Sequence, residues 1–166
     1  VYGLWRPHNP WTAPRRFFDL YDPEKIPFPP VGFSENDLDD VSAEGRDLAA
    51  IFGQRWAKHG ITNPESWQRI LHGYLACTSF ADWNLGRVIE ALKGSKYRNN
   101  TIVIVTSDNG YHVGEKHHYG KSTLWEDSAK VPLWVRLPDQ SLAGATCEAA
   151  VGLIDLYPTL QSFCSL

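Results

Sequence analysis

The feature that most constrains the fold is an uninterrupted run at residues 101–106, Thr-Ile-Val-Ile-Val-Thr. All six residues are β-branched, and such side chains pack better on a pleated sheet than in a helix. Four consecutive apolar residues without polar alternation are typical of a strand covered on both faces, as in parallel sheets. We therefore expect helices to flank a sheet that contains this strand.

A long amphipathic helix is predicted directly before this run. Apolar residues recur at steps of three and four between Pro64 and Leu92, as they do on the buried face of a helix. Asn63 suits the N-cap, Pro64 suits the first helical position, and Gly94 suits the end. A helix followed by a buried strand indicates an α/β protein.

Shorter elements are predicted on either side of this pair. We expect a helical piece near Leu48–Trp56 and a second strand at Val131–Leu137. The apolar segment Ala149–Leu160 predicts a short strand, followed by a helix that begins near Asp155 and Pro158.

The first 63 residues have a different character. Seven of the 11 prolines lie within the first 30 residues, among several aromatic residues. Proline removes backbone donors and aromatic rings need burial, so we expect an ordered, irregular segment held in place by its rings. The stretch Ser34–Asp47, with Asp37, Asp39 and Asp40, predicts a solvated loop. A metal-binding loop is the less favoured alternative, because the spacing of an EF-hand is missing.

Charge and cysteine content exclude several functions. The chain has 16 Lys and Arg against 19 Asp and Glu and a net charge of −3, which argues against binding to nucleic acid. Its apolar stretches are too short for a membrane span, and no signal peptide is predicted. Cys77, Cys147 and Cys164 form no metal or redox motif. Because the sequence begins at Val1 and contains no Met, we expect a processed protein or a piece of a longer one.

Chemistry is first indicated where the buried strand ends, at Ser107-Asp108-Asn109-Gly110. Ligands of open α/β sheets bind beyond the carboxyl ends of the strands. Asp108 and Asn109 offer a carboxylate and an amide oxygen, which suit Ca²⁺ or Mg²⁺ better than zinc. The same residues are also good turn formers, so a plain turn remains the alternative.

The following loop, residues 111–121, contains three histidines and two lysines. Cationic groups behind a metal pair predict a site for an anion such as a sulfate or phosphate ester. A histidine there could protonate the leaving group. For His117 and His118, ordinary surface positions remain the alternative.

The string from Thr101 to Leu137 resembles the formylglycine-dependent sulfatases of the alkaline phosphatase superfamily, and is most similar to the iduronate sulfatase-like branch. The likeness extends over nearly the whole chain. Residues 6–10 (Arg-Pro-His-Asn-Pro) are similar to the family's Lys-Pro-His-x-Pro segment, residues 74–92 to its long helix, and residues 152–160 to its Asp-Leu-Tyr-Pro-Thr-Leu helix start.

The resemblance implies an α/β fold that is a portion of an alkaline phosphatase-like three-layer sandwich with a mostly parallel central sheet. Residues 1–166 would be part of the sulfatase catalytic domain. Within it, residues 1–63 form the irregular segment rich in proline and aromatic residues, with its loops. Residues 64–166 supply the helix, the metal-site strand and the following α/β elements.

The resemblance also implies roles for individual residues. Asp108 and Asn109 match calcium ligands of the family, with Mg²⁺ as the less favoured ion. Lys121 matches the lysine that contacts the sulfate group, and His8 the histidine that protonates the departing alcohol. His112 and Arg6 match positions that reach the substrate. In the family, a hydrated formylglycine attacks sulfur, the alcohol departs, and sulfate is eliminated from the hemiacetal.

The chain departs from the family pattern at the nucleophile. No Cys or Ser is followed by the Pro of the Cys/Ser-x-Pro-x-Arg motif that becomes formylglycine, and the first aspartate pair of the family is also missing. Ca²⁺ takes about six to eight oxygen ligands, more than Asp108 and Asn109 supply. We therefore expect a portion of a larger sulfatase that is inactive alone and needs the remaining part of that chain.

The leading functional hypothesis is a sulfuric ester hydrolase acting on a sulfated small molecule or glycan, and the resemblance implies a secreted, periplasmic or lysosomal location. One alternative is a phosphoester or phosphonate ester hydrolase of the same superfamily. Another is a non-catalytic, sulfatase-like module that binds glycans. The joint presence of His8, Lys121, Asp108 and Asn109 argues against the last, because a binding module needs no leaving-group acid.

Overall fold

The computed structural model describes residues 1–27, 36–57 and 63–164. Pro29, Pro30 and Ser34, which belong to the predicted irregular segment and acidic loop, lie outside the described residues. The α-helices and strands are, in order, α1 (Arg15–Phe18), α2 (Ala43–Ala57), α3 (Pro64–Lys93), β1 (Val103–Thr106), β2 (His112–Val113), β3 (Tyr119–Gly120), α4 (Glu126–Ala129), β4 (Leu133–Arg136) and α5 (Leu156–Cys164). Short 3₁₀ turns lie at Pro23–Lys25, Glu115–His117 and Leu153–Asp155.

The long helix α3 begins and ends where the sequence predicts. The Asn63 side chain accepts a hydrogen bond from the Ser66 backbone N–H at 2.9 Å, and the Ser66 hydroxyl lies 3.3 Å from the Asn63 backbone N–H. This reciprocal capping satisfies donors that the first turn of a helix leaves open. Pro64 occupies the first turn and Gly94 is the C-cap. The helix is thus defined by local signals at both ends.

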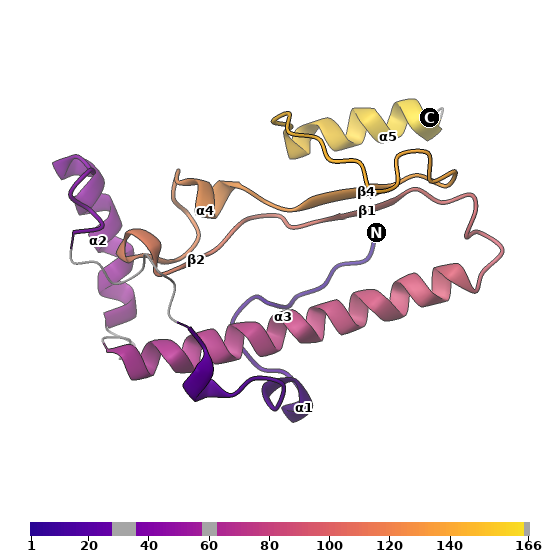
Figure 1. The fold of residues 1–166 in the computed structure, drawn as a ribbon. Helices are drawn as coiled ribbons and strands as arrows, with labels where there is room; N and C mark the ends of the chain where they lie inside the picture. The colour runs from indigo at the N-terminus through magenta and orange to yellow at the C-terminus, as the bar shows by residue number, and fades with distance from the viewer. Residues whose placement is uncertain (28–35, 58–62, 165–166) are drawn as a thin grey trace.

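Strands β1 and β4 form a two-stranded antiparallel pair, in which Val103 lies opposite Arg136 and Thr106 opposite Leu133. Figure 1 shows this pair running between α3 and α5, which gives a helix, sheet and helix arrangement. The α/β class is confirmed, and the sheet is a small part of the expected sandwich. The strand at Val131–Leu137 is confirmed as the shorter β4.

Two predictions about the strands are wrong in detail. Residues Val103–Val105 are half-buried and Thr106 is exposed, whereas coverage on both faces was expected. In the described part of the chain, β1 has a hydrogen-bonded neighbour on one edge only, and that neighbour is antiparallel. No strand forms within Ala149–Leu160 either. The Asp155 carboxylate accepts a hydrogen bond from the Gly152 N–H at 3.1 Å and starts a helical turn there instead.

The N-terminal segment is held by its rings, as predicted. Phe17 is buried beside Phe80 of α3, with ring centroids 5.1 Å apart. His72 Nε2 lies 2.9 Å from the Phe18 carbonyl oxygen, which fixes the same turn to the helix. In Figure 1 the segment before α1 runs between α3 and β1. Residues far apart in sequence therefore meet along α3.

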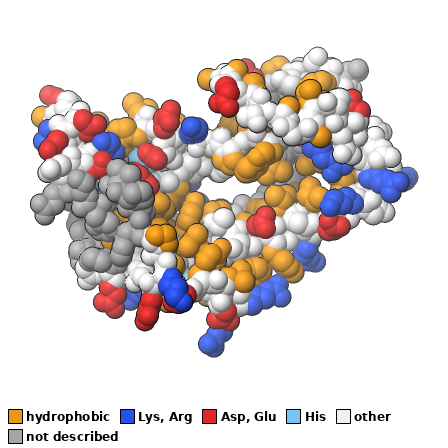
Figure 2. All heavy atoms as spheres, viewed as in Figure 1, with side chains coloured by type: hydrophobic (Ala, Val, Ile, Leu, Met, Phe, Trp, Pro, Cys, Tyr) orange, Lys and Arg blue, Asp and Glu red, His pale blue; other side chains and the backbone are white. Residues whose placement is uncertain are grey.

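The hydrophobic core lies at the N-terminal half of α3. It is formed by Ile26, Trp67, Ile70, Leu71 and Tyr119. Figure 2 shows further hydrophobic side chains along the hollow between the layer that contains α3 and the layer that contains the β1–β4 pair. No helix in the described ranges has both the length and the apolar character that a membrane crossing requires.

We predict that Trp67→Ala destabilises the protein by about 3–5 kcal/mol, the usual cost of emptying a core aromatic site. Trp67 is 5% exposed and its ring centroid lies 3.9 Å from that of Tyr119. Urea unfolding measures the change. Trp5→Ala is the matched control, because Trp5 is 68% exposed. Equal losses in the two variants would contradict this assignment of the core.

Candidate functional site

The loop after β1 is fixed by hydrogen bonds within itself and to α4. The Ser107 hydroxyl donates to the Asn109 carbonyl at 2.8 Å, and the Gly110 N–H donates to the Ser128 carbonyl at 2.9 Å. A Cβ atom at Gly110 would collide with the Asp127 carbonyl oxygen, so this close approach requires glycine. Asp108 is left exposed at the tip of the loop.

Lys121 contacts one residue of the predicted metal pair. Its ammonium donates a hydrogen bond to Asn109 Oδ1 at 2.8 Å, across 12 residues of sequence. The structure thus brings Lys121 to Asn109, with Asp108 next to Asn109 in the chain; these are three of the six residues selected from the sequence. A cation beside an oxygen ligand of a metal ion is an arrangement that could hold an anion next to that ion.

The donor set fits calcium in type but not in number. Carboxylate and amide oxygens are the ligands that Ca²⁺ prefers, and it takes about six to eight of them. Among the residues with described positions, no group of three His, Cys, Asp or Glu side chains is placed to bind one ion. Asp108 and Asn109 could therefore form only part of a calcium site.

His112 lies at the centre of a buried polar network next to the loop that follows β1. Its ring is fully buried, with Nε2 2.9 Å from the Thr123 hydroxyl and Nδ1 3.2 Å from the Glu115 carbonyl oxygen. The Thr123 hydroxyl lies 2.7 Å from that of Ser128. The Ser128 carbonyl also accepts the hydrogen bond from Gly110. The network therefore supports the loop of residues 107–110, which carries the predicted metal pair and is called the metal-pair loop below. The ring does not face solvent, so contact between His112 and substrate stays a prediction.

His118 is also fully buried, packed edge-on against His112 with ring centroids 4.9 Å apart. Burial lowers the pKa of His118, which favours the neutral ring. Its Nε2 lies 3.2 Å from the carbonyl oxygen of Lys121 and so helps to place that residue. The surface alternative holds for His117, which is exposed, and is wrong for His118.

An acidic turn that precedes α2 binds the loop of residues 111–121 through Lys116, and this contact is called the clasp below. The Lys116 ammonium lies 2.8 Å from Asp40 Oδ1 and 3.4 Å from Asp37 Oδ1, and the Lys116 N–H donates to Asp37 at 2.6 Å. Lys116 and His117 both have left-handed backbone conformations, with φ of 54° and 52°. Such conformations cost non-glycine residues energy, which these contacts offset. The acidic stretch is therefore part of the fold, and not only a solvated loop.

His8 and Arg6 lie together on the N-terminal loop. Arg6 donates hydrogen bonds from Nε to the Thr12 carbonyl at 2.8 Å and from Nη1 to the His8 carbonyl at 3.0 Å. His8 is exposed, and its Nδ1 lies 2.7 Å from the Asn9 carbonyl oxygen. No contact among the described residues joins His8 or Arg6 to Lys121.

Aromatic contacts connect this loop to the metal-pair loop. Trp11 lies edge-on to Tyr111 with ring centroids 6.3 Å apart, and Tyr111 stacks on Tyr74 of α3 at 5.6 Å. Burial raises the pKa of Tyr111 to about 12, so its hydroxyl stays neutral at physiological pH. The segment with His8 and the segment with Asp108 are thus both packed against α3.

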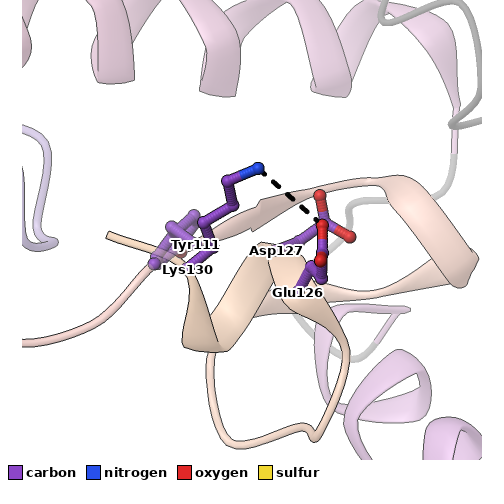
Figure 3. Close-up of a pocket in the computed structure, with 5 residues that line it drawn as sticks. Tyr111, Glu126, Asp127 and Lys130 are labelled. Atoms are coloured by element: carbon purple, nitrogen blue, oxygen red, sulfur yellow. Dashed lines mark ion pairs between the residues drawn. The ribbon is translucent and has the colours of Figure 1, made fainter. Parts of the chain in front are cut away.

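A shallow pocket opens beside the metal-pair loop (Figure 3). Its volume is about 380 Å³, and it is lined by Gly110, Tyr111, Glu126, Asp127 and Lys130. The Lys130 ammonium lies 4.0 Å from Glu126 Oε2 across one turn of α4. Both side chains are mostly exposed, so this ion pair contributes little to stability.

Sequence reasoning missed Thr123, Ser128 and the clasp between Asp37 and Lys116. The two hydroxyl residues follow Lys121 closely, but nothing in a single sequence indicates that their side chains turn inward. Asp37 and Lys116 are 79 residues apart, so no local spacing could have paired them.

The fold is that of an α/β protein of the alkaline phosphatase-like class, with Asp108 and Asn109 in the loop at the end of a sheet strand and Lys121 beside Asn109. The family model for sulfatases matches residues 2–163. The chain belongs to the sulfatase family.

Individual relatives are similar over nearly the whole chain. A sulfatase of Formosa agariphila is 40% identical over 99% of this chain and 32% of its own length. The iduronate 2-sulfatase of Mus musculus is 28% identical over 99% of this chain and 35% of its own length. A phosphonate monoester hydrolase from Silicibacter pomeroyi has a TM-score of 0.76 and 28% identity over 96% of this chain and 32% of its own. The chain spans about a third of the length of these relatives.

We predict that Thr123→Val destabilises the protein by about 1–3 kcal/mol, because it leaves buried polar atoms of His112 and Ser128 without their partner. Thr123→Ser keeps the hydroxyl and should restore most of the loss. Thr78→Val on the exposed side of α3 is the control. Denaturant unfolding of the three variants measures these differences, and a Ser variant as unstable as the Val variant would contradict the role of the hydroxyl.

The hydrogen bond and charge of Lys116 lower the pKa of the Asp40 carboxyl. Because the folded-state pKa is depressed, the stabilisation is present above the usual Asp pKa of 3.8 and is lost as pH falls through the folded value. We expect Lys116→Met to raise the Asp40 pKa, as followed by NMR titration of the carboxyl carbon. Lys130→Met is the control. An unchanged Asp40 pKa in Lys116→Met would rule out the clasp.

Proposed function

We propose that the protein to which this chain belongs is a sulfuric ester hydrolase that cleaves a sulfate monoester. The observation that carries the proposal is the 2.8 Å contact between the Lys121 ammonium and Asn109 Oδ1 at the carboxyl end of β1. A cation fixed there can neutralise the oxygens of a sulfate group. Membership of the sulfatase family supports the same reaction.

His8 is proposed as the group that protonates the departing alcohol. A carbonyl oxygen only accepts hydrogen bonds, so Nδ1, which faces the Asn9 carbonyl, carries a hydrogen. The proton to be transferred is then held at Nε2, where an exposed imidazole can take and give it. Arg6 holds the loop in shape through the His8 carbonyl and is proposed to approach the substrate as well.

Asp108 and Asn109 are proposed to hold Ca²⁺, together with oxygen ligands from elsewhere in the protein. When bound, the ion would balance the negative charge of the sulfate oxygens. Lys121 then orients Asn109 and keeps a positive charge beside the substrate. His112, through Thr123 and Ser128, is proposed to fix the loop that carries both metal ligands.

The nucleophile is proposed to be a formylglycine on a part of the protein outside these 166 residues. No Cys or Ser in the sequence has Pro two positions later, so this stretch alone should not turn over substrate. We further propose a sulfated carbohydrate as substrate and an iduronate sulfatase-like branch, supported by the likeness to a protein named iduronate 2-sulfatase. A location outside the cytoplasm follows the same proposal.

A phosphonate or phosphate ester hydrolase is the second candidate. The likeness to the phosphonate monoester hydrolase of Silicibacter pomeroyi favours it, and Lys121 would neutralise phosphoryl oxygens equally well. Comparing the rates of hydrolysis of an aryl sulfate and an aryl phenylphosphonate by the whole protein separates the two. A higher kcat/KM for the phosphonate would replace the sulfatase proposal.

In the whole protein, Lys121→Met should lower kcat/KM for an aryl sulfate by about 100- to 1,000-fold, the usual cost of removing one preorganised charge-stabilising donor. The matched control is Lys93→Met, whose ammonium pairs with Glu90 on the surface of α3. Steady-state kinetics give the ratio, and urea unfolding checks that the variant is folded. A folded Lys121→Met protein with unchanged kcat/KM would remove Lys121 from the site.

A further inference from the structure

A second cationic surface lies on the other side of α3 from the strand pair. It consists of Arg16, Trp83 and Arg87, which we call the Arg–Trp cluster. The Arg16 guanidinium carbon lies 4.6 Å from the Trp83 ring centroid, and that of Arg87 lies 4.9 Å from it. Figure 1 shows α1, which carries Arg16, on the face of α3 turned away from β1.

Two phenylalanine rings pack against the Trp83 indole of this cluster. Phe80 stacks on Trp83 with ring centroids 6.3 Å apart, and the buried Phe17 lies edge-on to Trp83 at 6.0 Å. Arg16 also lies over the Phe17 ring at 4.9 Å. Trp83 itself remains 41% exposed. The platform is therefore rigid on its inner side and open to solvent on its outer side.

The two guanidinium groups have no acidic partner in the described part of the chain. Neighbouring charges are paired: Arg15 lies 3.7 Å from Asp19, and Glu90 lies 2.6 Å from Lys93. No carboxylate of the described residues lies within ion-pair distance of Arg16 or Arg87. The cluster therefore presents two positive charges that are not neutralised locally.

Stacking leaves these groups well suited to bind an oxyanion. A guanidinium over a ring uses its flat face, and its N–H donors point outward around the rim. Because stacking already restricts the side chains, less conformational entropy is lost when a ligand binds. Arginine donors match pairs of oxygens on sulfate, phosphate or carboxylate, and the exposed indole edge offers an apolar contact for a sugar ring.

We propose that the Arg–Trp cluster is a second binding site, for the sulfate groups of a sulfated saccharide, separate from the Lys121 site. The choice of sulfate over another oxyanion rests on the proposed function. The site would hold a sulfated chain on one side of α3 while the loop after β1 acts on the other. Inorganic phosphate shares the recognition chemistry and is included as a competing ligand in the test.

The test uses protein that carries Lys121→Met, so that binding at the proposed active site does not obscure the second site. Isothermal titration compares a fully sulfated hexasaccharide of the heparin type with its unsulfated counterpart. Adding R16Q and R87Q together should raise the Kd for the sulfated probe about tenfold or more, since charge-assisted hydrogen bonds are lost. The charge-matched control pair, R15Q with R69Q, should change it less than about twofold.

A second measurement locates binding without relying on the variants. In NMR titrations, the indole N–H signal of Trp83, assigned with Trp83→Phe, should shift with the sulfated probe. The signal of Trp134, also exposed, should not.

The proposal would be overturned by no shift at Trp83, by equal weakening with the control pair, or by equal affinity for the unsulfated probe. Binding of inorganic phosphate that matches the sulfated probe would also overturn it, by showing a general anion site. Loss of folding or altered self-association in R16Q/R87Q, with no binding by the parent, would mean that the cluster serves a protein contact. None of these outcomes depends on turnover, so failure of this proposal and failure of the proposed function are distinguishable.

Discussion

The packing of Trp67 against Tyr119 is the contact on which the remaining structure depends. Trp67 comes from the first turn of α3 and Tyr119 from β3, so the contact fixes the loop of residues 111–121 to the long helix. The Trp67 ring also occupies the space that a Cβ atom at Gly114 would need, and Gly114 has a φ of 133°. Both facts require glycine at this position. Aromatic burial therefore determines the path of the backbone that carries the histidines and lysines.

Polar contacts then refine what this packing positions. The metal-pair loop is held through Gly110, Ser128 and Thr123, and the buried His112 lies at the end of that series. Buried polar groups are costly unless they are paired, so each hydroxyl in the series specifies one arrangement of its neighbours. Lys121 then reaches Asn109 with little freedom. Of the site residues near β1, Asp108 is exposed and Asn109 and Lys121 are half-buried, whereas His112 and Ser128, which support the loop, are buried.

The sequence alone was sufficient to predict the structure where the signals are local. Asn63, Pro64 and Gly94 mark the ends of α3 without any knowledge of contacts, whereas the metal pair after β1 stays a prediction. It was insufficient where the outcome depends on distant partners. The antiparallel pairing of β1 with β4 depends on a segment about 30 residues later, and the burial of His112 and His118 depends on how the loop folds back. The role of Asp37 could not be predicted, because its partner Lys116 lies 79 residues away.

The clasp between Asp37 and Lys116 also has a kinetic consequence. Closing a loop of 79 residues costs chain entropy before any contact offsets it, whereas α3 forms from neighbours a few residues apart. We therefore expect α3 to be complete before the 111–121 loop adopts its left-handed conformation at Lys116 and His117. We expect the loop that leads to Lys121 to reach its final conformation after α3 has formed.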